Sequence, residues 1–157
     1  MRILVAGGAG YIGSNMTALL AAEGHEPVVF DNLCNGHRSA VRDAELIEGD
    51  LADCGLLSEV LQKYRIEAVM HFAAHAQVGE SVEFPLKYYQ NNLSNTQNLL
   101  SAMEQTGVDK FVFSSTAAVY GIPKTVPITE ESPKSPINPY GETKLAVEKM
   151  LGWFDHV

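Results

Sequence analysis

Short, unbroken apolar runs alternate with longer segments of helical periodicity along most of this chain. Runs of this length, without a polar residue on every second position, are typical of strands in a parallel sheet that is covered on both faces. We therefore predict five strands, at residues 3–6, 27–31, 44–48, 68–72 and 110–114.

The segments between the runs predict helices. A first helix is expected over residues 11–23, a second over 53–64, a long third over 85–105, and a last one that begins at Pro139. The order β-α-β-β-α-β-α-β-α predicts an α/β fold with a doubly wound parallel sheet, which is a Rossmann fold. The expected apolar stripes are residues 12, 16, 19 and 20; 56, 57, 60 and 61; and 93, 99, 100 and 103.

Several helix ends carry sequence signals. Gly24 follows the first helix as a C′ glycine, and Asp53 precedes the second as an N-cap. Asn138 and Pro139 form an N-cap followed by a proline at the first helical position. The proline-rich stretch before them, residues 121–139, is predicted to be a loop.

A glycine cluster separates the first strand from the first helix. The sequence GGAGYIG over residues 7–13 satisfies G-x-G-x-x-G from Gly8 and G-x-x-G-x-x-G from Gly7. Such glycines allow a tight turn, a close approach of the backbone to a pyrophosphate, and close packing of helix on strand. The free amides at the helix start, aided by the helix dipole, then face the phosphates. This position in a strand–turn–helix unit predicts a dinucleotide site.

Two acidic residues follow the next two strands. Asp31 ends the second strand, at about the spacing at which a carboxylate binds the ribose hydroxyls of a dinucleotide and repels a 2′-phosphate. No arginine is adjacent to it, since Arg38 lies seven positions on. NAD is therefore favoured over NADP. Asp50, after the third strand, suits a contact to the adenine edge; an ordinary strand-end cap or turn remains the alternative at both positions.

A phenol and an ammonium lie four residues apart in the last predicted helix, as Tyr140 and Lys144. This spacing places them on one helical face. The hydroxyl cluster at residues 114–116 follows the fifth strand, where a doubly wound sheet opens its ligand crevice. A phenol ionises only near pH 10, so a fixed cation such as Lys144 is needed to make it a base at neutral pH. With Thr116 as a hydrogen-bond partner, the set predicts removal of an alcohol proton while hydride passes to a nicotinamide.

Charge and composition exclude several other classes. The net charge of −8 and the lack of a basic run argue against nucleic acid and against an anionic membrane surface. No apolar stretch is long enough to span a membrane. Cys34 and Cys54 show no paired spacing, which suits the cytoplasm. His71 and His75 straddle a strand end without an accompanying carboxylate motif, so no metal site is expected.

Seven segments together resemble the UDP-glucose 4-epimerases, which are extended short-chain dehydrogenases/reductases. In order they are GGAGYIGS, FDNLCNG, EGDLAD, HFAAHAQVGES, NN at 91–92, FVFSSTAAVYG and NPYGETKL, and the resemblance runs from Met1 to about Met150. It implies NAD as the cofactor and a UDP-hexose as the substrate. The implied cofactor residues are Gly7, Gly10, Tyr11, Ile12, Gly13, Asp31, Asn32, Asn35, Asp50, Leu51, Phe72, Ala73, Ala74, Asn91, Tyr140 and Lys144, and the implied catalytic residues are Thr116, Tyr140 and Lys144.

Two positions depart from patterns found among these enzymes, and two more distinguish the chain from a related group. Thr116 stands where many members have serine, which keeps the hydroxyl, and Ala76 stands where some have a lysine that contacts NAD. Sugar 4,6-dehydratases have an Asp-Glu pair where this chain has Ala117 and Ala118. Because neither alanine can transfer a proton, dehydration is disfavoured.

The resemblance implies an isomerase that interconverts UDP-glucose and UDP-galactose. The sugar would be oxidised at C4, the bound 4-keto sugar would rotate, and hydride would return to its opposite face. Two alternatives remain open at this point: another NAD-dependent nucleotide-sugar oxidoreductase or epimerase, and a non-catalytic NAD-binding module. The residues that would select the sugar lie outside this sequence.

The chain ends soon after the predicted catalytic helix. A full dinucleotide fold has a sixth strand, and the resemblance implies a sugar-binding segment beyond it. We therefore expect residues 1–157 to be one NAD-binding Rossmann domain, truncated or naturally shortened, that lacks its last strand and the substrate domain. The uncovered fifth strand would then be an edge suited to homo-oligomerisation.

Overall fold

The computed structural model describes residues 1–154, and the last three residues of the predicted domain, 155–157, lie outside this range. The chain divides into two compact units. The first unit contains Met1–Ala74 and Gln97–Ser114, and the second contains His75–Thr96 and the chain from Ser115 onward. No helix within residues 1–154 is both long and apolar enough to cross a membrane.

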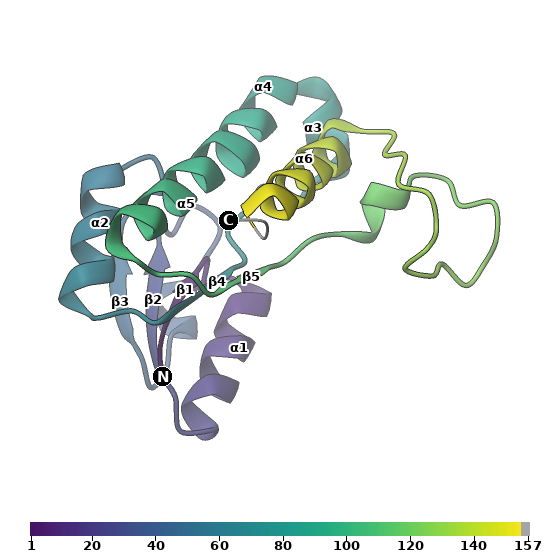
Figure 1. Ribbon diagram of the computed structural model, residues 1–157. Helices are drawn as coiled ribbons and strands as arrows, with labels where there is room; N and C mark the ends of the chain where they lie inside the picture. The colour runs from purple at the N-terminus through teal and green to yellow at the C-terminus, as the bar shows by residue number, and fades with distance from the viewer. Residues whose placement is uncertain (155–157) are drawn as a thin grey trace. The chain divides into compact units, whose positions relative to one another are not determined.

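The first unit is built on a five-stranded parallel sheet (Figure 1). Its strand order is β3-β2-β1-β4-β5, so the chain starts in the middle and winds outward in both directions. This confirms the predicted doubly wound fold. The central strand β1 is almost entirely apolar and buried, as expected where both sheet faces are covered. The strands are β1 Arg2–Ala6, β2 Glu26–Asp31, β3 Glu45–Glu48, β4 Ala68–His71 and β5 Phe111–Phe113.

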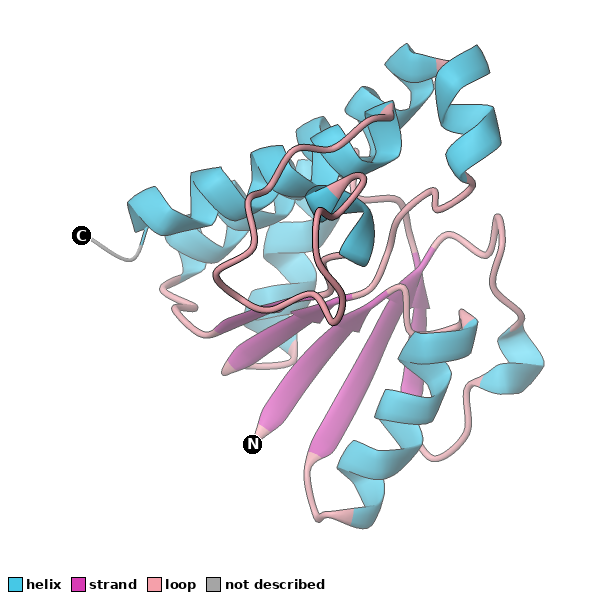
Figure 2. Cartoon of the chain, turned by 90° about the vertical axis from the view of Figure 1, so that its right-hand side faces the viewer, coloured by secondary structure: helices cyan, strands magenta, loops and turns pink. Residues whose placement is uncertain are grey.

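Helices cover both faces of this sheet. Helix α1 (Tyr11–Ala22) lies on one face, and α2 (Cys54–Lys63) and α5 (Asn95–Thr106) lie on the other (Figures 1 and 2). Helix α5 begins in the second unit and continues into the first at Gln97. The change of face follows from the strand order, because right-handed crossovers in opposite directions along a sheet place their helices on opposite sides.

The predicted helix ends are confirmed. Asp53 caps α2, since its Oδ1 accepts a hydrogen bond from the Leu56 amide at 2.9 Å. Gly24 ends α1 with a φ of +79°, a conformation that glycine adopts without strain. The amides of Gly24 and His25 reach back to the carbonyl oxygens of Ala21 and Leu20 at 3.1 and 2.9 Å.

Only part of the apolar stripe expected for α1 faces the core, since Leu20 packs, partly buried, against the cluster of Ile3, Val5 and Val29. Ile12 and Leu19 are 58% and 53% exposed, whereas Gly13 and Thr17 are buried. Thr17 satisfies its own hydroxyl by donating to the Gly13 carbonyl at 2.8 Å. Because Gly13 and Thr17 are small, this face of α1 can lie close to the rest of the unit. This close approach determines the orientation of α1 more strongly than its apolar periodicity does.

The second unit consists of short helices and the long α6 (Pro139–Phe154). Helix α3 (Val78–Glu83) is followed by α4 (Pro85–Tyr88) and then by a π-helical segment, Tyr89–Ser94, that leads into α5. The predicted helix over 85–105 therefore begins at Pro85 as expected, but the π-helical segment interrupts it, and α3 was not predicted. A 3-10 turn, Ala117–Tyr120, precedes the loop that leads to α6.

Candidate functional site

Three glycines shape the turn between β1 and α1, in the first unit. Gly7 has a φ of +81°, and a Cβ on it would lie 2.4 Å from the Ala73 amide nitrogen. A Cβ on Gly13 would lie 2.2 Å from the Gly7 carbonyl oxygen. Neither position can hold a side chain, because the obstacles are backbone atoms. Gly8 packs against the Val29 side chain. Gly7 and Gly13, the first and last glycines of G-x-x-G-x-x-G, are therefore positions at which the turn requires glycine.

Gly10 differs from its neighbours. It is the N-cap of α1 with ordinary backbone angles, and a Cβ on it would have one neighbour within 4 Å, the Gly7 oxygen at 3.4 Å. No side chain caps the helix, and its first turn contains no acidic residue. The first amides of a helix have no partner within the helix, and together with the dipole they attract an anion. This open, uncapped helix start fits the pyrophosphate of a dinucleotide.

Asp31 ties the end of β2 to the glycine turn. It is only 7% exposed, and its Oδ2 accepts from the Ala9 amide at 2.9 Å while its Oδ1 accepts from the Leu33 amide at 2.8 Å. Each carboxylate oxygen can accept a further hydrogen bond. The residue therefore acts as the strand-end cap considered from the sequence, and it retains capacity for the two ribose hydroxyls.

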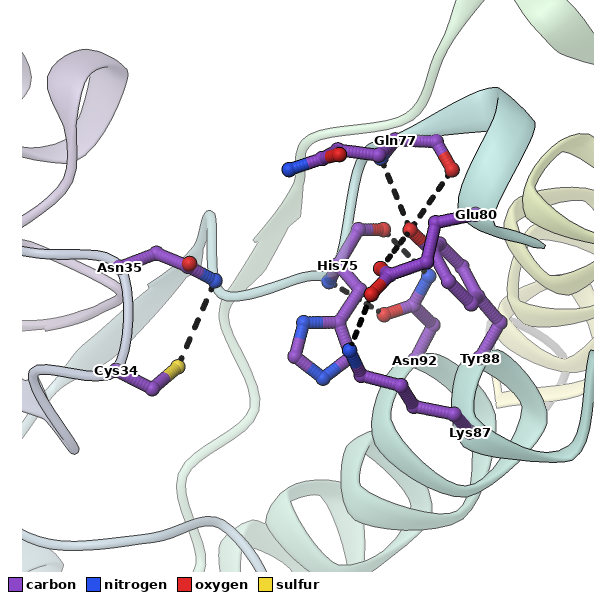
Figure 3. Close-up of polar contacts among 8 residues, drawn as sticks. All are labelled: Cys34, Asn35, His75, Gln77, Glu80, Lys87, Tyr88 and Asn92. Carbon is purple, nitrogen blue, oxygen red and sulfur yellow. Dashed lines mark hydrogen bonds and ion pairs between the residues drawn. The ribbon is translucent and has the colours of Figure 1, made fainter. Parts of the chain in front are cut away.

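Polar side chains at the ends of β2 and β3 are also linked. Asn32 donates to Asp50 Oδ2 at 2.7 Å, and Asp50 Oδ1 accepts from the Ala52 amide at 2.8 Å. The Leu51 carbonyl accepts from Asn98 at 3.1 Å. Figure 3 shows Asn35, whose amide nitrogen lies 3.6 Å from Cys34 Sγ. Nearby, Arg38 forms an ion pair with Glu48.

The chain that leaves β4 runs directly beside the glycine turn. The amides of Phe72 and Ala73 both donate to the Ala6 carbonyl, at 2.7 and 3.0 Å. This pairing extends the contact between β1 and β4 beyond the strands and brings Phe72, Ala73 and Ala74 alongside Gly7. The first unit thus brings together the predicted cofactor residues at positions 7–13, 31–35, 50–51 and 72–74.

The remaining predicted residues belong to the second unit, where α6 carries Tyr140 and Lys144. Asn138 Oδ1 accepts from the Gly141 amide at 2.8 Å, which confirms the predicted N-cap. A Cβ on Gly141 would lie 2.7 Å from the Ala118 carbonyl oxygen, so the start of α6 packs directly on the 3-10 turn. Tyr140 itself is half-buried.

Thr116 opens that 3-10 turn. Its hydroxyl oxygen accepts from the Ala118 amide at 3.2 Å, which makes it the N-cap of the turn. A threonine hydroxyl that accepts one hydrogen bond can still donate its own hydrogen. The side chain is half-buried and keeps the donor that the predicted role requires.

Lys144 is 3% exposed, an unusual degree of burial for a lysine. Burial lowers the pKa of Lys144 from its ordinary value of 10.5 to about 8, because desolvation disfavours the charged ammonium. It remains mostly protonated at neutral pH. Strongly shifted pKa values of this kind are frequent at functional sites.

Asn92, which belongs to the NN motif at 91–92 but has no role predicted from sequence, organises the π-helical segment. Its side chain donates to the His75 carbonyl at 3.0 Å and accepts from the His75 amide at 2.9 Å (Figure 3). It also donates to Thr143 Oγ1 on α6 at 3.3 Å. Asn91 donates to the Asn92 oxygen at 3.0 Å. The Asn-Asn pair is the sequence signal for this arrangement. The sequence does not show which contacts Asn92 makes, because its partners His75 and Thr143 are distant from it in sequence.

Tyr88 is a second buried polar residue for which the sequence predicted no role. Figure 3 shows its hydroxyl between Gln77 and Glu80; it accepts from the Gln77 amide at 3.1 Å and lies 2.8 Å from each of its possible acceptors, Gln77 O and Glu80 Oε2. The pKa of Tyr88 is raised to about 12, mainly because its hydroxyl is buried and next because it forms a hydrogen bond to Glu80. The ring packs edge-on to Tyr140, with centroids 6.5 Å apart. Tyr88 therefore supports the position of Tyr140 without ionising.

Within residues 1–154 no three histidine, cysteine or acidic side chains group in a way that could hold a metal ion. The division of the chain into two units separates the predicted site residues into two groups. The first unit holds a dinucleotide-type turn, and the second holds a hydroxyl–phenol–ammonium set.

Comparison with known proteins adds the evolutionary relation. The chain is 53% identical to a UDP-glucose 4-epimerase of Lactobacillus helveticus, covering 99% of this chain and 47% of that protein. It is 50% identical to that of Bacillus subtilis, covering 96% and 47%. The chain thus spans about half the length of the curated relatives it matches.

Solved structures give the same picture. A UDP-glucose 4-epimerase from Brucella ovis in complex with NAD matches with a TM-score of 0.96 and 52% identity, over 98% of this chain and 47% of that one. One from Bifidobacterium longum in complex with NAD+ and UDP matches with a TM-score of 0.94 and 39% identity, over 97% and 48%. The model of the NAD dependent epimerase/dehydratase family matches residues 3–156. The chain belongs to the NAD dependent epimerase/dehydratase family.

Proposed function

We propose that this chain is the NAD-binding part of a UDP-glucose 4-epimerase, which interconverts UDP-glucose and UDP-galactose. The observation that carries the proposal is the glycine turn, whose open and uncapped helix start at Gly10 suits a pyrophosphate. The names of its relatives at 50–53% identity support the choice of reaction. An ordinary structural turn would not need an uncapped helix start beside a buried carboxylate.

The cofactor contacts are proposed for the first unit and for three residues of the second, Asn91, Tyr140 and Lys144. The amides of the turn hold the pyrophosphate, and Asp31 accepts the ribose hydroxyls. Because that carboxylate would repel a 2′-phosphate, and because Arg38 is engaged by Glu48, NAD is preferred over NADP. The full set is Gly7, Gly10, Tyr11, Ile12, Gly13, Asp31, Asn32, Asn35, Asp50, Leu51, Phe72, Ala73, Ala74 and Asn91, with Tyr140 and Lys144.

The proton chemistry is proposed for three residues of the second unit. Tyr140 removes the proton of the sugar C4 hydroxyl and later returns it, and the ammonium of Lys144 stabilises the phenolate. Thr116 donates a hydrogen bond to the reacting oxygen. Bound NAD supplies reversible acceptance of the C4 hydride. Both half-reactions need only one base, so the same tyrosine serves oxidation and reduction of the sugar.

Two alternatives are weighed on particular residues. Dehydration of the sugar would require an acid and a base after Thr116, and Ala117 and Ala118 supply neither. A non-catalytic NAD-binding module would not need a lysine buried to 3% exposure, since burying an ammonium without a function is costly. The epimerase is therefore preferred.

Turnover tests this proposal directly. The 157-residue chain and a fusion of it to the C-terminal half of the Lactobacillus helveticus relative are assayed for UDP-galactose conversion to UDP-glucose. We expect the chain alone to bind NAD but to epimerise poorly or not at all, and the fusion to be active. In the fusion, Tyr140→Phe should lower kcat at least about 1,000-fold, while calorimetry still detects NAD binding.

Tyr120→Phe is the matched control, since Tyr120 is half-buried in the same unit and has no proposed role. It should leave kcat within about threefold of the parent. Full activity of the Tyr140→Phe fusion would contradict the assignment of the base. Turnover by the 157-residue chain alone would contradict the expected dependence on the missing half.

Two further properties are proposed, a cytoplasmic location and association between copies of the chain. Both cysteines are free and exposed, which agrees with a cytoplasmic location. The edge strand β5 is proposed as a surface through which copies of the chain associate.

A further inference from the structure

We propose that Glu148 is a positioning residue for the epimerase reaction, because its carboxylate fixes Ser115 and thereby the neighbouring Thr116 against the helix that carries Tyr140 and Lys144. This inference rests on the proposed function and extends it to a residue outside the predicted site.

Glu148 lies on the same face of α6 as the two predicted catalytic side chains. It follows Tyr140 by eight residues and Lys144 by four, which places the three in one row along the helix. Its side chain is only 21% exposed. A carboxylate that is mostly withdrawn from water needs hydrogen-bond partners. Those partners show what Glu148 holds.

Both carboxylate oxygens are engaged within the second unit. The Ser115 hydroxyl donates to Oε1, and the Lys134 ammonium donates to Oε2 at 2.5 Å. Lys134 belongs to the loop before α6, and we call its ion pair with Glu148 the Lys134 arm. Because the Lys134 side chain is 41% exposed, solvent screens this ion pair, and it contributes little to stability. The Ser115 arm is a hydrogen bond to a charged acceptor, the stronger kind.

The Ser115 contact fixes Thr116 because the two residues share a peptide unit. Thr116 has extended backbone angles, φ −153° and ψ 148°. Successive side chains of an extended segment point to opposite sides, so holding Ser115 on α6 sets the direction in which Thr116 projects. Glu148 thus acts on the proposed hydroxyl donor through its neighbour rather than by direct contact.

A second attachment of the same segment lies near the start of α6. The Gly141 backbone packs against the Ala118 carbonyl, where a Cβ would lie 2.7 Å from the oxygen. Gly141 and Glu148 are seven residues apart, which corresponds to about 10 Å along a helix. Thr116 lies in sequence between the two attached residues, Ser115 and Ala118. Two separated attachments fix the orientation of the segment as well as its position, so loss of the Glu148 attachment leaves Thr116 free to rotate.

The test uses four variants that separate the two arms. Glu148→Ala removes both contacts, and Glu148→Gln keeps an oxygen that can accept from Ser115. Ser115→Ala removes only the Ser115 arm, and Lys134→Met removes only the loop arm. A displacement of about 1 Å in a reacting group costs up to about 100-fold in rate. We therefore expect Glu148→Ala and Ser115→Ala to lower kcat of the active fusion by about 10- to 100-fold with KM within threefold.

The conservative variant and the control give the opposite result. Glu148→Gln and Lys134→Met should each keep kcat within about threefold of the parent. The double variant Ser115→Ala with Glu148→Ala should be no slower than the slower single variant, because both changes remove the same contact.

A second readout is made on the 157-residue chain itself. The Ala118 amide, which donates to Thr116 Oγ1, should exchange its hydrogen at least about tenfold faster in Glu148→Ala and Ser115→Ala, and at the parent rate in Glu148→Gln. Unfolding midpoints identify a variant that has lost its fold, and Ser115→Ala then serves as the milder probe.

Two results in an active fusion would overturn the positioning role of Glu148 and leave the proposed function standing. One is that Glu148→Ala and Ser115→Ala keep the parent kcat. The other is that Glu148→Gln is as slow as Glu148→Ala. A fusion that never turns over overturns the proposed function and the catalytic part of this inference with it, while hydrogen exchange still decides whether Glu148 holds the Thr116 segment.

Discussion

At the scale of single residues, Lys144 illustrates a conflict between stability and function. Burial lowers its pKa from 10.5 to about 8, which corresponds to about 3 kcal/mol of unfavourable desolvation. Below pH 8 the ammonium is charged in both the folded and the unfolded chain, so the full penalty applies. Between pH 8 and 10.5 only the unfolded chain holds the proton, and the folded state gains stability as pH rises.

Lys144→Met is therefore expected to change how stability depends on pH. The free energy of unfolding of the variant minus that of the parent should fall by up to about 3 kcal/mol between pH 8 and 10.5, because methionine carries no proton. Urea unfolding at pH 7 and at pH 11, with Lys149→Met as the exposed control, measures it. A difference that does not change with pH would contradict burial as its cause.

At the scale of elements, the glycine turn and α1 separate a binding role from a folding role. A Cβ on Gly10 has only the Gly7 oxygen near it, at 3.4 Å, whereas a Cβ on Gly13 lies 2.2 Å from that same oxygen. Gly10→Ala should therefore fold with an unfolding free energy within about 1 kcal/mol of the parent, and it should weaken NAD binding at least tenfold because a methyl group occupies the approach to the helix amides.

Gly13→Ala should instead lower the free energy of unfolding by about 3 kcal/mol or prevent folding, since the obstacle is backbone. Gly152→Ala, in open space on α6, is the control, and it should leave NAD binding unchanged and raise the free energy of unfolding by at most about 1 kcal/mol. Calorimetric titration with NAD and urea unfolding give the two quantities. If Gly10→Ala bound NAD as tightly as the parent, the turn would not be the pyrophosphate site.

The elements also show how far the sequence determines the fold. Five apolar runs and the caps at Gly24, Asp53 and Asn138 were sufficient to predict the sheet and three helix boundaries, because these signals are local. The π-helical segment was not predictable, since it depends on Asn92 bonding to the backbone of His75 and to Thr143, 17 and 51 residues away. The network of Glu148 was missed for the same reason: Ser115 lies 33 residues from it.

At the scale of the whole molecule, the division into two units assigns the proposed tasks to different parts of the chain. The dinucleotide turn belongs to the sheet unit, and the proton-transferring residues belong to the helical unit. The sequence predicted one Rossmann domain, since alternating strands and helices gave no sign of where the chain departs from the sheet. The departure occurs at His75, directly after the segment that lines Gly7.

The sheet also ends in a way that bears on association between copies of the chain. Strand β5 is last in the order β3-β2-β1-β4-β5, and Val112 at its centre is 52% exposed. An apolar edge strand offers backbone groups that a second copy can pair with, and a charged side chain at its centre opposes such pairing. We expect the chain to self-associate at micromolar concentration, and Val112→Lys to raise the concentration of half-dissociation at least tenfold.

Sedimentation velocity over a range of concentrations measures this effect. Leu86→Lys is the matched control, because Leu86 on α4 is 82% exposed and the same charge is introduced away from the sheet edge. Each substitution adds the same single positive charge to a chain of net charge −8, so only a loss specific to Val112→Lys supports pairing through β5. Dissociation caused by Leu86→Lys alone would assign the contact to the helical unit instead, and a parent chain that stays monomeric at all concentrations would contradict association through either surface.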